Sequence, residues 1–394
     1  MKKTAYDVAI AGCGVGGLYT ALNMPHNKNI LIITKSDVAS SDSMLAQGGI
    51  CVLHDENDYD AYFEDTMKAG HYENRKESVG IMISSSRSII NDLLELGVRF
   101  EKNNDGSLKY TREGAHSRPR ICFHEDVTGK EITTVLLEKV KELPNVDILE
   151  YTTMTDIQEK KGICTGIKAM QDDEELIISS PYVVMATGGI GGLYEHSTNF
   201  PHLTGDGCRI AKEHGVALEH MDYVQIHPTS LYSKNNGRSF LISESARGEN
   251  AVLLNSRGER FVDELLPRDV VSAAIYKEMQ KEGSQHVWMS FAKVPEKVIK
   301  EHFPHIYEKC LEEGYNILKE PIPIVPAQHY FMGGVHVDSN SETTMPNLFA
   351  VGETSCNGVH GKNRLASNSL LESLVFAKRA AKEISQRINQ GKCI

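Results

Sequence analysis

The stretch YDVAIAGCGVGGLYTALNM, from Tyr6 to Met24, joins a short apolar run, a glycine-rich turn and a segment rich in alanine and leucine. This pattern predicts a strand, a loop and the beginning of a helix. A second apolar run, NILIIT at Asn29 to Thr34, predicts the next strand. The chain therefore opens as a βαβ unit, which is typical of an α/β fold with a parallel sheet.

The turn in this unit has the spacing GxGxxG, with glycines at Gly12, Gly14 and Gly17. Glycines at these places permit a tight turn, close approach of the backbone to a pyrophosphate, and packing of the helix on the strand. Such loops also occur for packing alone, but a strand before and a helix after favour dinucleotide binding. We expect contacts from the whole loop: Gly12, Cys13, Gly14, Val15, Gly16 and Gly17.

The carboxylate that usually ends the second strand and binds the adenosine ribose is missing. Thr34 and Lys35 occupy that place. Two alternatives stay open, in which Asp37 substitutes for the missing carboxylate or Lys35 contacts phosphate or ribose instead.

Three further segments and one long helix indicate which dinucleotide binds. AQGGI at Ala46 to Ile50 lets the backbone approach a flat ring, and MATGG at Met185 to Gly189 ends a strand in glycines. NLFAVGE places Glu353 where a carboxylate can accept hydrogen bonds from a polyol, and a helix from about Ser367 would direct its positive end at an anion. Each feature alone is ordinary turn chemistry; together, in this order, they predict a flavin.

The rest of the chain predicts a discontinuous organisation. Short strands from Asp147 to Ser180 indicate a small antiparallel sheet, and PYVVMATGG returns the chain to the parallel sheet. From about Met221 to Ala327 the pattern is irregular, with helices near Arg268 to Lys281 and His302 to Glu313. We predict a flavin domain formed by residues 1–220 and 331–394, with an α+β capping domain, residues 221–330, inserted into it.

Composition excludes several classes of protein. The 394 residues carry a formal net charge of −11, which argues against a binder of nucleic acid or of anionic membranes. No apolar run is long enough to span a membrane, and the N-terminus lacks the apolar segment of a signal peptide. The eight cysteines show no metal or iron–sulfur spacing. We therefore expect a cytoplasmic protein with reduced cysteines and no metal.

Later segments offer donors to an anion. They are QIHPTSLY, SESARGENAVLLNSRGERF, LLPRDVV, PAQHYFMGG and HGKNRLASNSLLES, and they supply His227, Ser243, Arg268, His329 and Arg364. Because arginine clamps a carboxylate bidentately, two arginines and two histidines suit a substrate with two carboxylates. A single histidine is more often structural, and Arg247, Arg257 and Arg260 are interpreted as partners in surface ion pairs.

These segments, in this order, resemble the succinate dehydrogenase/fumarate reductase flavoprotein family over nearly the whole chain, from about Tyr6 to Ala381. The resemblance implies a Rossmann-like FAD-binding domain with a capping domain, substrate between them, and hydride transfer to flavin N5. It also implies that Arg268 donates and accepts the proton, and that the dicarboxylate is bound by Gln225, His227, Ser243, His329 and Arg364. Contacts to FAD would come from Lys35, Ser43, Ala46, Gln47, Gly48, Gly49, Asp206, Glu353, Ser369 and Leu370.

The segment TREGAHSRPR, Thr111 to Arg120, places one acid, Glu113, among cationic residues. Respiratory members of the family have an apolar residue there, whereas the REGxHS pattern and the ASNSLLE ending resemble the branch that oxidises L-aspartate. Aspartate is succinate with an α-ammonium group, and a buried acid can hold that group and discriminate strongly for it. We therefore predict that Glu113 orients the amine and that its cationic neighbours keep it ionised.

The implied activity is FAD-dependent oxidation of L-aspartate to iminoaspartate, with electrons passed to oxygen or fumarate, as the first step of de novo NAD biosynthesis. Hand-over of the unstable product to quinolinate synthase is part of that expectation. The position of the histidine that attaches FAD covalently in respiratory members is Asp42 here, so FAD should bind non-covalently. Longer members continue into a C-terminal helical domain, which we expect to be absent after Ile394.

Two alternatives differ in class. The first is a soluble fumarate reductase or succinate dehydrogenase-type flavoprotein, against which Glu113 and Asp42 argue. The second is a non-catalytic FAD-binding scaffold or a subunit of an electron-transfer complex. Retention of every proposed donor, including Arg268, argues against it.

Overall fold

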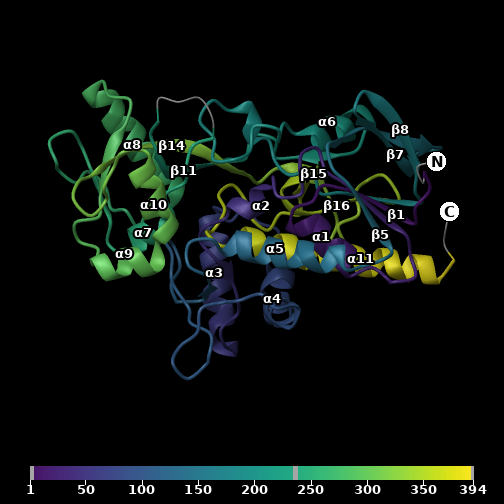
Figure 1. Cartoon of the computed structure of the whole chain (residues 1–394), viewed down its shortest axis with the longest axis horizontal. Helices are drawn as coiled ribbons and strands as arrows, with labels where there is room; N and C mark the ends of the chain where they lie inside the picture. Colours follow the sequence, from purple (N-terminus) through teal and green to yellow (C-terminus); the bar gives the residue numbers. More distant parts are fainter. Residues whose placement is uncertain (1–3, 234–237, 392–394) are drawn as a thin grey trace.

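A five-stranded parallel sheet forms the centre of the larger part of the molecule (Figure 1). The computed structural model describes residues 4–233 and 238–391. In spatial order the strands are β16 (Leu348–Ala350), β9 (Tyr182–Met185), β1 (Val8–Ala11), β2 (Ile30–Ile33) and β5 (Val146–Leu149). The glycine loop follows the central strand, so the predicted βαβ opening is confirmed.

Successive residues of these strands point to opposite faces of the sheet and build two separate cores. On one face Val8 and Ile10 pack with three helices, α1 (Val15–Leu22), α5 (Thr128–Lys141) and α11 (Asn368–Asn389). Complete burial of such apolar side chains contributes roughly 1.5–3 kcal/mol each. This layer therefore fixes the beginnings of α1 and α11 relative to the ends of the strands.

The opposite face is covered by a small antiparallel sheet, which the sequence predicted. It contains β6 (Thr152–Lys160), β7 (Ile163–Gln171) and β8 (Glu174–Ser179). One assignment was wrong: Asp147 to Leu149 belong to β5, which pairs in parallel with β2. The reason is that α5 serves as the crossover helix, and a crossover returns the chain to a parallel strand beside its neighbour.

A second part of the molecule, drawn in green in Figure 1, is built on a four-stranded antiparallel sheet. Its strands, in order, are β11 (Val224–Leu231), β14 (Ile322–Phe331), β13 (Val287–Ser290) and β12 (Val252–Leu254). Its helices are α7 (Glu244–Gly248), α8 (Arg268–Glu282), α9 (Glu296–His302) and α10 (Pro304–Glu312). This part has its own apolar core, and we call it the capping part; the domain bounds at 220/221 and 330/331 stay a prediction.

Further elements complete the larger part of the molecule. Two of them are the helices α3 (Tyr59–Ala69) and α4 (Lys76–Leu96). The others are α2 (Asp42–Leu45), β3 (Ile50–Cys51), β4 (Ile121–Cys122), α6 (Asp206–Glu213), β10 (Leu218–Glu219), β15 (Gly334–His336), β17 (Ser355–Cys356) and the 3₁₀ turns η1 (Glu56–Asp58), η2 (Gly191–Leu193) and η3 (Gly352–Thr354).

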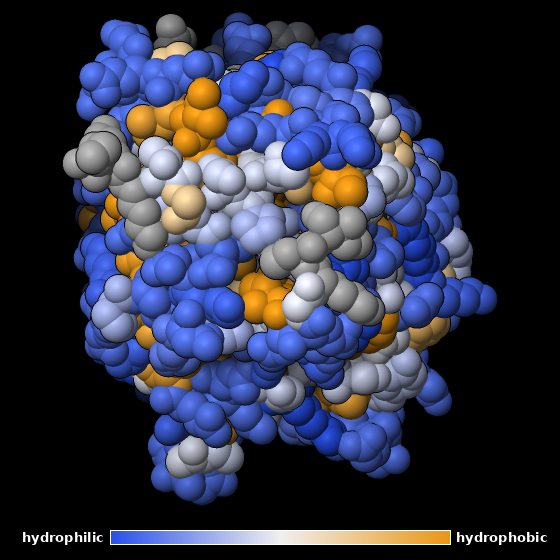
Figure 2. Space-filling view, turned by 90° about the vertical axis from the view of Figure 1, so that its right-hand side faces the viewer, coloured by the Kyte–Doolittle hydropathy of each residue, from blue (hydrophilic) through white to orange (hydrophobic). Residues whose placement is uncertain are grey.

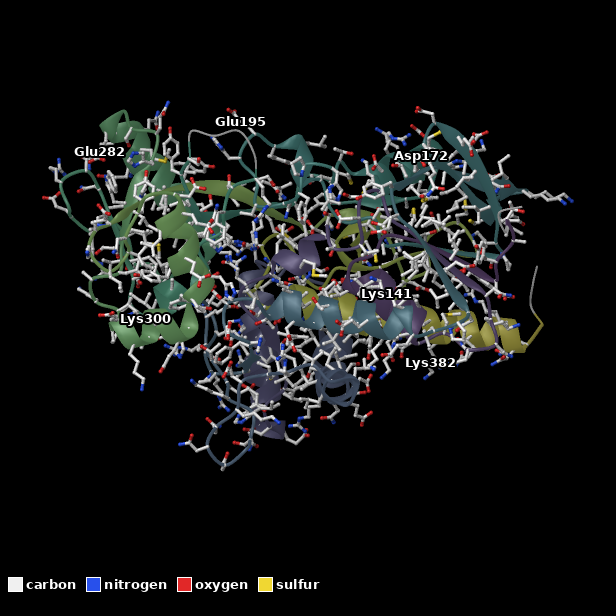
Figure 3. All side chains as sticks on the ribbon, in the orientation of Figure 1. Lys141, Asp172, Glu195, Glu282, Lys300 and Lys382 are labelled. Atoms are coloured by element: carbon white, nitrogen blue, oxygen red, sulfur yellow. The ribbon has the colours of Figure 1, made fainter. Side chains whose placement is uncertain are left out.

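Charged side chains lie mainly on the outside, as Lys300 and Asp172 illustrate in Figure 3. The face turned to the viewer in Figure 2 is mostly hydrophilic, with hydrophobic residues in small separate groups. In the described part of the chain, no helix combines the length and apolarity that crossing a bilayer requires. The same residues contain no cluster of three or more histidine, cysteine or acidic side chains suited to a metal ion.

Candidate functional site

One cavity extends from the glycine loop after β1 to the capping sheet. Both glycine loops line it at one end and His227 and His329 line it at the other, so a single space connects the place for a dinucleotide with the place for a small substrate. The site residues predicted from the sequence all line it, with two exceptions, Gly17 and Gln225.

The glycine loop is shaped by close backbone contacts. Gly12 has φ +121°, and a Cβ there would lie 1.9 Å from the carbonyl oxygen of Ala186. A Cβ at Gly17 would lie 2.1 Å from the carbonyl oxygen of Gly12, so Gly17 packs α1 against the loop without reaching the cavity. The N-cap residue of α1 is Gly14, which has no side chain to cap the helix, and Ser43 Oγ accepts from the Val15 N–H at 3.2 Å. The positive end of the helix therefore faces the cavity with Ser43 beside it, an arrangement suited to an anion.

The second glycine loop, Ala46 to Gly49, is equally restricted. A Cβ at Gly49 would lie 2.3 Å from the Ile121 side chain, and one at Gly48 would lie 2.5 Å from Glu113 Oε1. Gln47 is buried, and its Oε1 has no partner among the described residues. A close-packed backbone with an unpaired buried oxygen fits a ligand that presses a polar ring against this loop.

Two carboxyl groups that line the cavity, Glu353 and Asp42, lie close enough for their charges to interact. Glu353 accepts a hydrogen bond from the Phe331 N–H at 2.9 Å, and burial, reinforced by the charge of Asp42, raises its pKa to about 8. Asp42 accepts one from the Phe200 N–H at 2.9 Å, and burial raises its pKa to about 7. Its second oxygen, Oδ2, has no partner within the described residues. Glycine cradles and unpaired polar atoms together fit FAD.

Lys35 and Asp37, the two residues considered for the ribose contact, differ in their position relative to the cavity. The Lys35 ammonium lines the cavity and donates to Asp206 at 2.7 Å and to the His202 carbonyl at 2.9 Å. Asp37 accepts bonds from its own loop, including Ser40 at 2.6 Å, and does not line the cavity. Of the two, only Lys35, paired with Asp206, lines the cavity.

Two histidines from the capping sheet face the other end of the cavity, with ring centres 5.0 Å apart. Burial, followed by the charge of Arg268, holds the pKa of both His227 and His329 well below the ordinary value. His227 Nδ1 lies 3.2 Å from both the N–H and the carbonyl oxygen of Thr229, so it accepts from the first or donates to the second depending on the tautomer. Nε2 is buried and has no partner in the described structure, which leaves it available to a ligand in the cavity.

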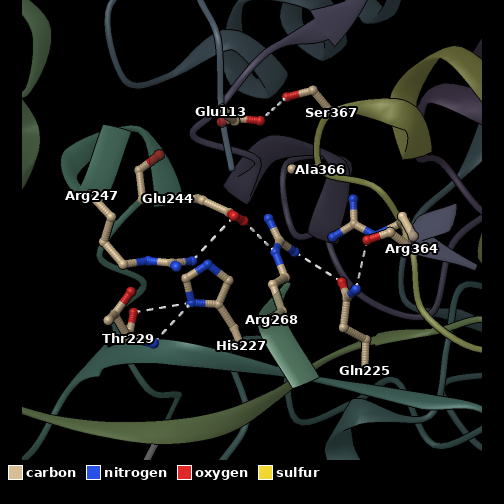
Figure 4. A network of polar contacts seen from close by, with 12 residues as sticks. Glu113, Gln225, His227, Thr229, Glu244, Arg247, Arg268, Arg364, Ala366 and Ser367 are labelled. Atoms are coloured by element: carbon tan, nitrogen blue, oxygen red, sulfur yellow. Dashed lines mark hydrogen bonds and ion pairs between the residues drawn. The ribbon is translucent and has the colours of Figure 1, made fainter. Parts of the chain in front are cut away.

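The two predicted arginines lie close by, as Figure 4 shows. Arg364 donates to Ser369 Oγ at 2.7 Å, and its guanidinium lies 4.3 Å from the centre of the Tyr330 ring. Burial, followed by the nearby Arg268, lowers the pKa of Arg364 to about 10. An arginine in this state gains from binding a carboxylate, which replaces its lost water.

Arg268 is held by two side chains that leave part of its guanidinium facing the cavity. Its Nη1 donates to Gln225 Oε1 at 2.9 Å and its Nε to Glu244 Oε2 at 2.5 Å. Glu244 Oε1 in turn lies 3.3 Å from the buried Arg247. Burial raises the pKa of Glu244, but Arg268 and Arg247 outweigh it, and the net pKa lies below the ordinary value. Gln225 therefore orients Arg268 from outside the cavity.

Glu113 lies at the same end, but its surroundings differ from the prediction. It is 4% exposed, accepts from Ser367 at 2.6 Å and from Ser245 at 3.0 Å, and has a pKa raised by burial and by Glu244. The cations of its own loop are not the groups that keep it ionised, so that part of the prediction was wrong.

Those cations are engaged or distant because the loop folds them away from Glu113. Arg120 is saturated by Asp58 and Asp65, burial lowers the pKa of His116 to about 4, and Arg112 and Arg118 are exposed. The groups that favour the Glu113 anion are two serine hydroxyls and Arg268, which reach it from elsewhere in the chain.

The interpretation of the three spare arginines as surface residues holds for two of them. Arg257 and Arg260 pair with Glu259 and Glu264 near the surface. Arg247 does not: it is buried, and its Nε has no hydrogen-bond partner within the described chain. Sequence reasoning also missed Glu244, Tyr330 and Ser367. All three stood inside quoted motifs, and Glu244 was further marked as an acid among donors, whereas no feature of the motifs gave Tyr330 or Ser367 a role at the substrate end.

Comparisons with known proteins agree with this geometry. The family model described as "FAD binding domain" matches residues 7–370. L-aspartate oxidase of Clostridium perfringens is 50% identical, over 99% of this chain and 88% of that protein. The corresponding enzyme of Clostridium acetobutylicum is 47% identical, over 97% and 88%. Among solved structures, an E. coli quinol fumarate reductase superposes with a TM-score of 0.92 at 31% identity, over 99% of this chain and 72% of that one.

Fold and cavity thus define a flavoprotein of the succinate dehydrogenase/fumarate reductase class, with FAD as its cofactor. Within that class, the chain belongs to the L-aspartate oxidase family. The resemblance seen in the sequence motifs is confirmed.

Proposed function

We propose that the protein oxidises L-aspartate to iminoaspartate and passes the electrons to oxygen or fumarate. The observation that carries this proposal is the lining of one end of the cavity, where Glu113 lies among donors suited to two carboxylates. Aspartate carries an ammonium group that a buried carboxylate can bind. Succinate has no such group.

Substrate binding follows from the unpaired donors. His227, through Nε2, and Arg364 receive carboxylate oxygens, and Ser243 and His329 complete the set. Glu113 accepts the ammonium, which fixes the face of Cα that is presented. FAD, when bound, supplies the hydride acceptor. It is held by the two glycine loops, the Lys35–Asp206 pair, Glu353, Ser369 and Leu370.

Arg268 is placed to move the accompanying proton. Arginine alone is a poor base because its ordinary pKa exceeds about 12. Here Nε lies 2.5 Å from Glu244 Oε2, and the opposite oxygen of Glu244 contacts Arg247. Arg268 can therefore pass its Nε proton to the Glu244 carboxylate and, as the neutral base, take up the proton from the substrate. Arg247 favours the ionised form of Glu244 before that transfer, which keeps the carboxylate ready to accept the proton. The relay lies on α7 and α8, so it belongs to the capping part.

FAD binds non-covalently in this proposal, because the carboxyl of Asp42 occupies the attachment position. Acid precipitation should therefore release all flavin into the supernatant.

The proposed location is the cytoplasm. The seven cysteines within the described residues are buried and unpaired, which fits that compartment. Iminoaspartate hydrolyses, so rapid consumption by quinolinate synthase suits the chemistry.

Anaerobic flavin bleaching tests the proposal. The FAD-loaded protein is mixed with L-aspartate or with succinate, and the visible flavin absorbance is followed. Bleaching by aspartate alone, with recovery on adding fumarate, is the expected result. Bleaching by succinate alone would contradict the proposal and support a succinate dehydrogenase-type flavoprotein. Bleaching by neither substrate would support a non-catalytic FAD-binding scaffold.

A further inference from the structure

Ser367, directly before α11, has an unusual backbone. Its φ is +62°, in the left-handed region that residues other than glycine rarely adopt. Serine at this position of a helix normally caps it by accepting a hydrogen bond from an N–H of the first turn. Here the side chain makes no capping bond. Because Ser367 keeps a strained backbone without capping α11, its hydroxyl is expected to have another function.

The hydroxyl of Ser367 joins two parts of the cavity instead. It accepts a hydrogen bond from the Gly49 N–H at 3.2 Å and donates to Glu113 Oε2 at 2.6 Å. The residue is 8% exposed, and its carbonyl accepts from the Cys51 N–H at 3.0 Å. Any side chain at Gly48 would collide with this arrangement, because a Cβ there would lie 2.5 Å from Glu113 Oε1 and 3.3 Å from Ser367 Oγ.

We propose that Ser367 is the positioning residue that makes Glu113 selective for an amino-dicarboxylate, an inference that rests on the proposed function. Burial and the nearby Glu244 disfavour the charged form of Glu113, and a short donor hydrogen bond opposes both. The same hydroxyl connects the Glu113 carboxylate to the second glycine loop, Ala46 to Gly49, by accepting from the Gly49 N–H.

The placement along the chain adds a second reason. Ser367 follows the carboxylate-binding Arg364 by three residues, and Arg364 is itself anchored to Ser369 at 2.7 Å. One short loop therefore places both a donor to a substrate carboxylate and the support of the amine acceptor. The separation of these groups is fixed by that backbone, which suits a substrate whose carboxylate and amine have a fixed separation.

The test is Ser367→Gly in the FAD-loaded protein. Glycine adopts φ +62° without strain, so the Tm should stay within about 3 °C of wild type. The KM for L-aspartate should rise about tenfold, the effect of losing one hydrogen bond to a charged group. The dissociation constant of succinate, measured by perturbation of the flavin spectrum, should change by less than about twofold, since no amine is involved.

A second readout separates positioning from mere structure. Losing the donor raises the pKa of Glu113, so the acidic limb of the aspartate pH profile should move to higher pH. Ser341→Gly is the matched control, because Ser341 also has a left-handed φ, +67°, and lies outside the cavity; it should leave both ligands unaffected. Equal weakening of aspartate and succinate by Ser367→Gly, or no change, would overturn the inference. Wild-type protein that binds succinate but not aspartate would overturn the proposed function itself.

Discussion

At the scale of single residues, the decisive feature is a carboxylate buried among cations. Glu113 shares its end of the cavity with Arg268 and Arg364, and its anion is supported by hydroxyls from two separate segments. An isolated buried carboxylate would be neutral, so this environment is what allows it to bind an ammonium group.

Glu113→Gln should raise the KM for L-aspartate at least about tenfold and leave succinate binding within about threefold, because only aspartate loses an ionic partner. In the wild type, aspartate affinity should fall as the pH drops through the raised pKa of Glu113, which lies above the ordinary 4.5. The variant should lack this limb. Steady-state kinetics across pH measures both effects, with Glu101→Gln, a change outside the cavity, as the control. Equal losses for the two ligands would contradict the assigned role.

At the scale of elements, α11 does more than complete the core. Its first turn carries Ser369 and Leu370 on the cavity, and Glu372 directly behind them, 1% exposed. Burial raises the pKa of Glu372 to about 7, although Asn357 and Ser373 donate to its oxygens. The beginning of this helix therefore contains an acid that prefers to be neutral.

The pH dependence of stability should reveal that acid. Its folded pKa, about 7, exceeds the ordinary 4.5, so stability present below pH 4.5 is lost as the pH rises toward 7. Relative to Glu372→Gln, wild type should lose roughly 3 kcal/mol over that range. Urea unfolding at several pH values measures it. Glu383→Gln, farther along the same helix, should follow the wild-type curve; a parallel curve for Glu372→Gln would show that Glu372 is ionised throughout.

At the scale of the whole molecule, the site exists only where the two parts meet. Ser245 of the capping part donates to Glu113 of the other part. At a second contact Asp126 is 2% exposed, accepts from the Ile306 N–H at the start of α10 at 2.9 Å, and lies 2.6 Å from His305. These bonds hold the capping helices over the cavity.

Asp126→Ala should loosen that contact, because it leaves a helix N–H and a histidine without their partner, at a cost of about 1–3 kcal/mol. Limited proteolysis should cut the capping part faster, and both dicarboxylates should bind more weakly, since donors to both come from that part. Asp105→Ala is the control, as Asp105 bonds only within its own exposed loop. Unchanged proteolysis would mean that other contacts hold the capping part.

Local patterns predicted much of the fold. Three features depend on local periodicity and on glycines required by a particular backbone conformation, so they could be predicted from the sequence. They are the strand–glycine–helix opening, the small antiparallel sheet and the long final helix. The boundary at Asp147 was misassigned, because whether a short apolar run joins a parallel or an antiparallel sheet depends on the neighbour it meets. The proposed donors to a dicarboxylate were selected because arginine and histidine in motif order indicate anion chemistry, and the structure brings these side chains together at one cavity.

The sequence by itself determined the class of cofactor and a set of arginine, histidine and serine side chains, with one acid among them, that line one cavity. Only the tertiary structure decided what surrounds that acid. Arg120 and His116, its neighbours in sequence, are turned to Asp58, Asp65 and each other, whereas Ser245, Ser367 and Arg268 reach it from distant segments. Charge proximity along a chain does not predict proximity in space, because folding pairs each buried ion with whichever partner lies within a few ångströms.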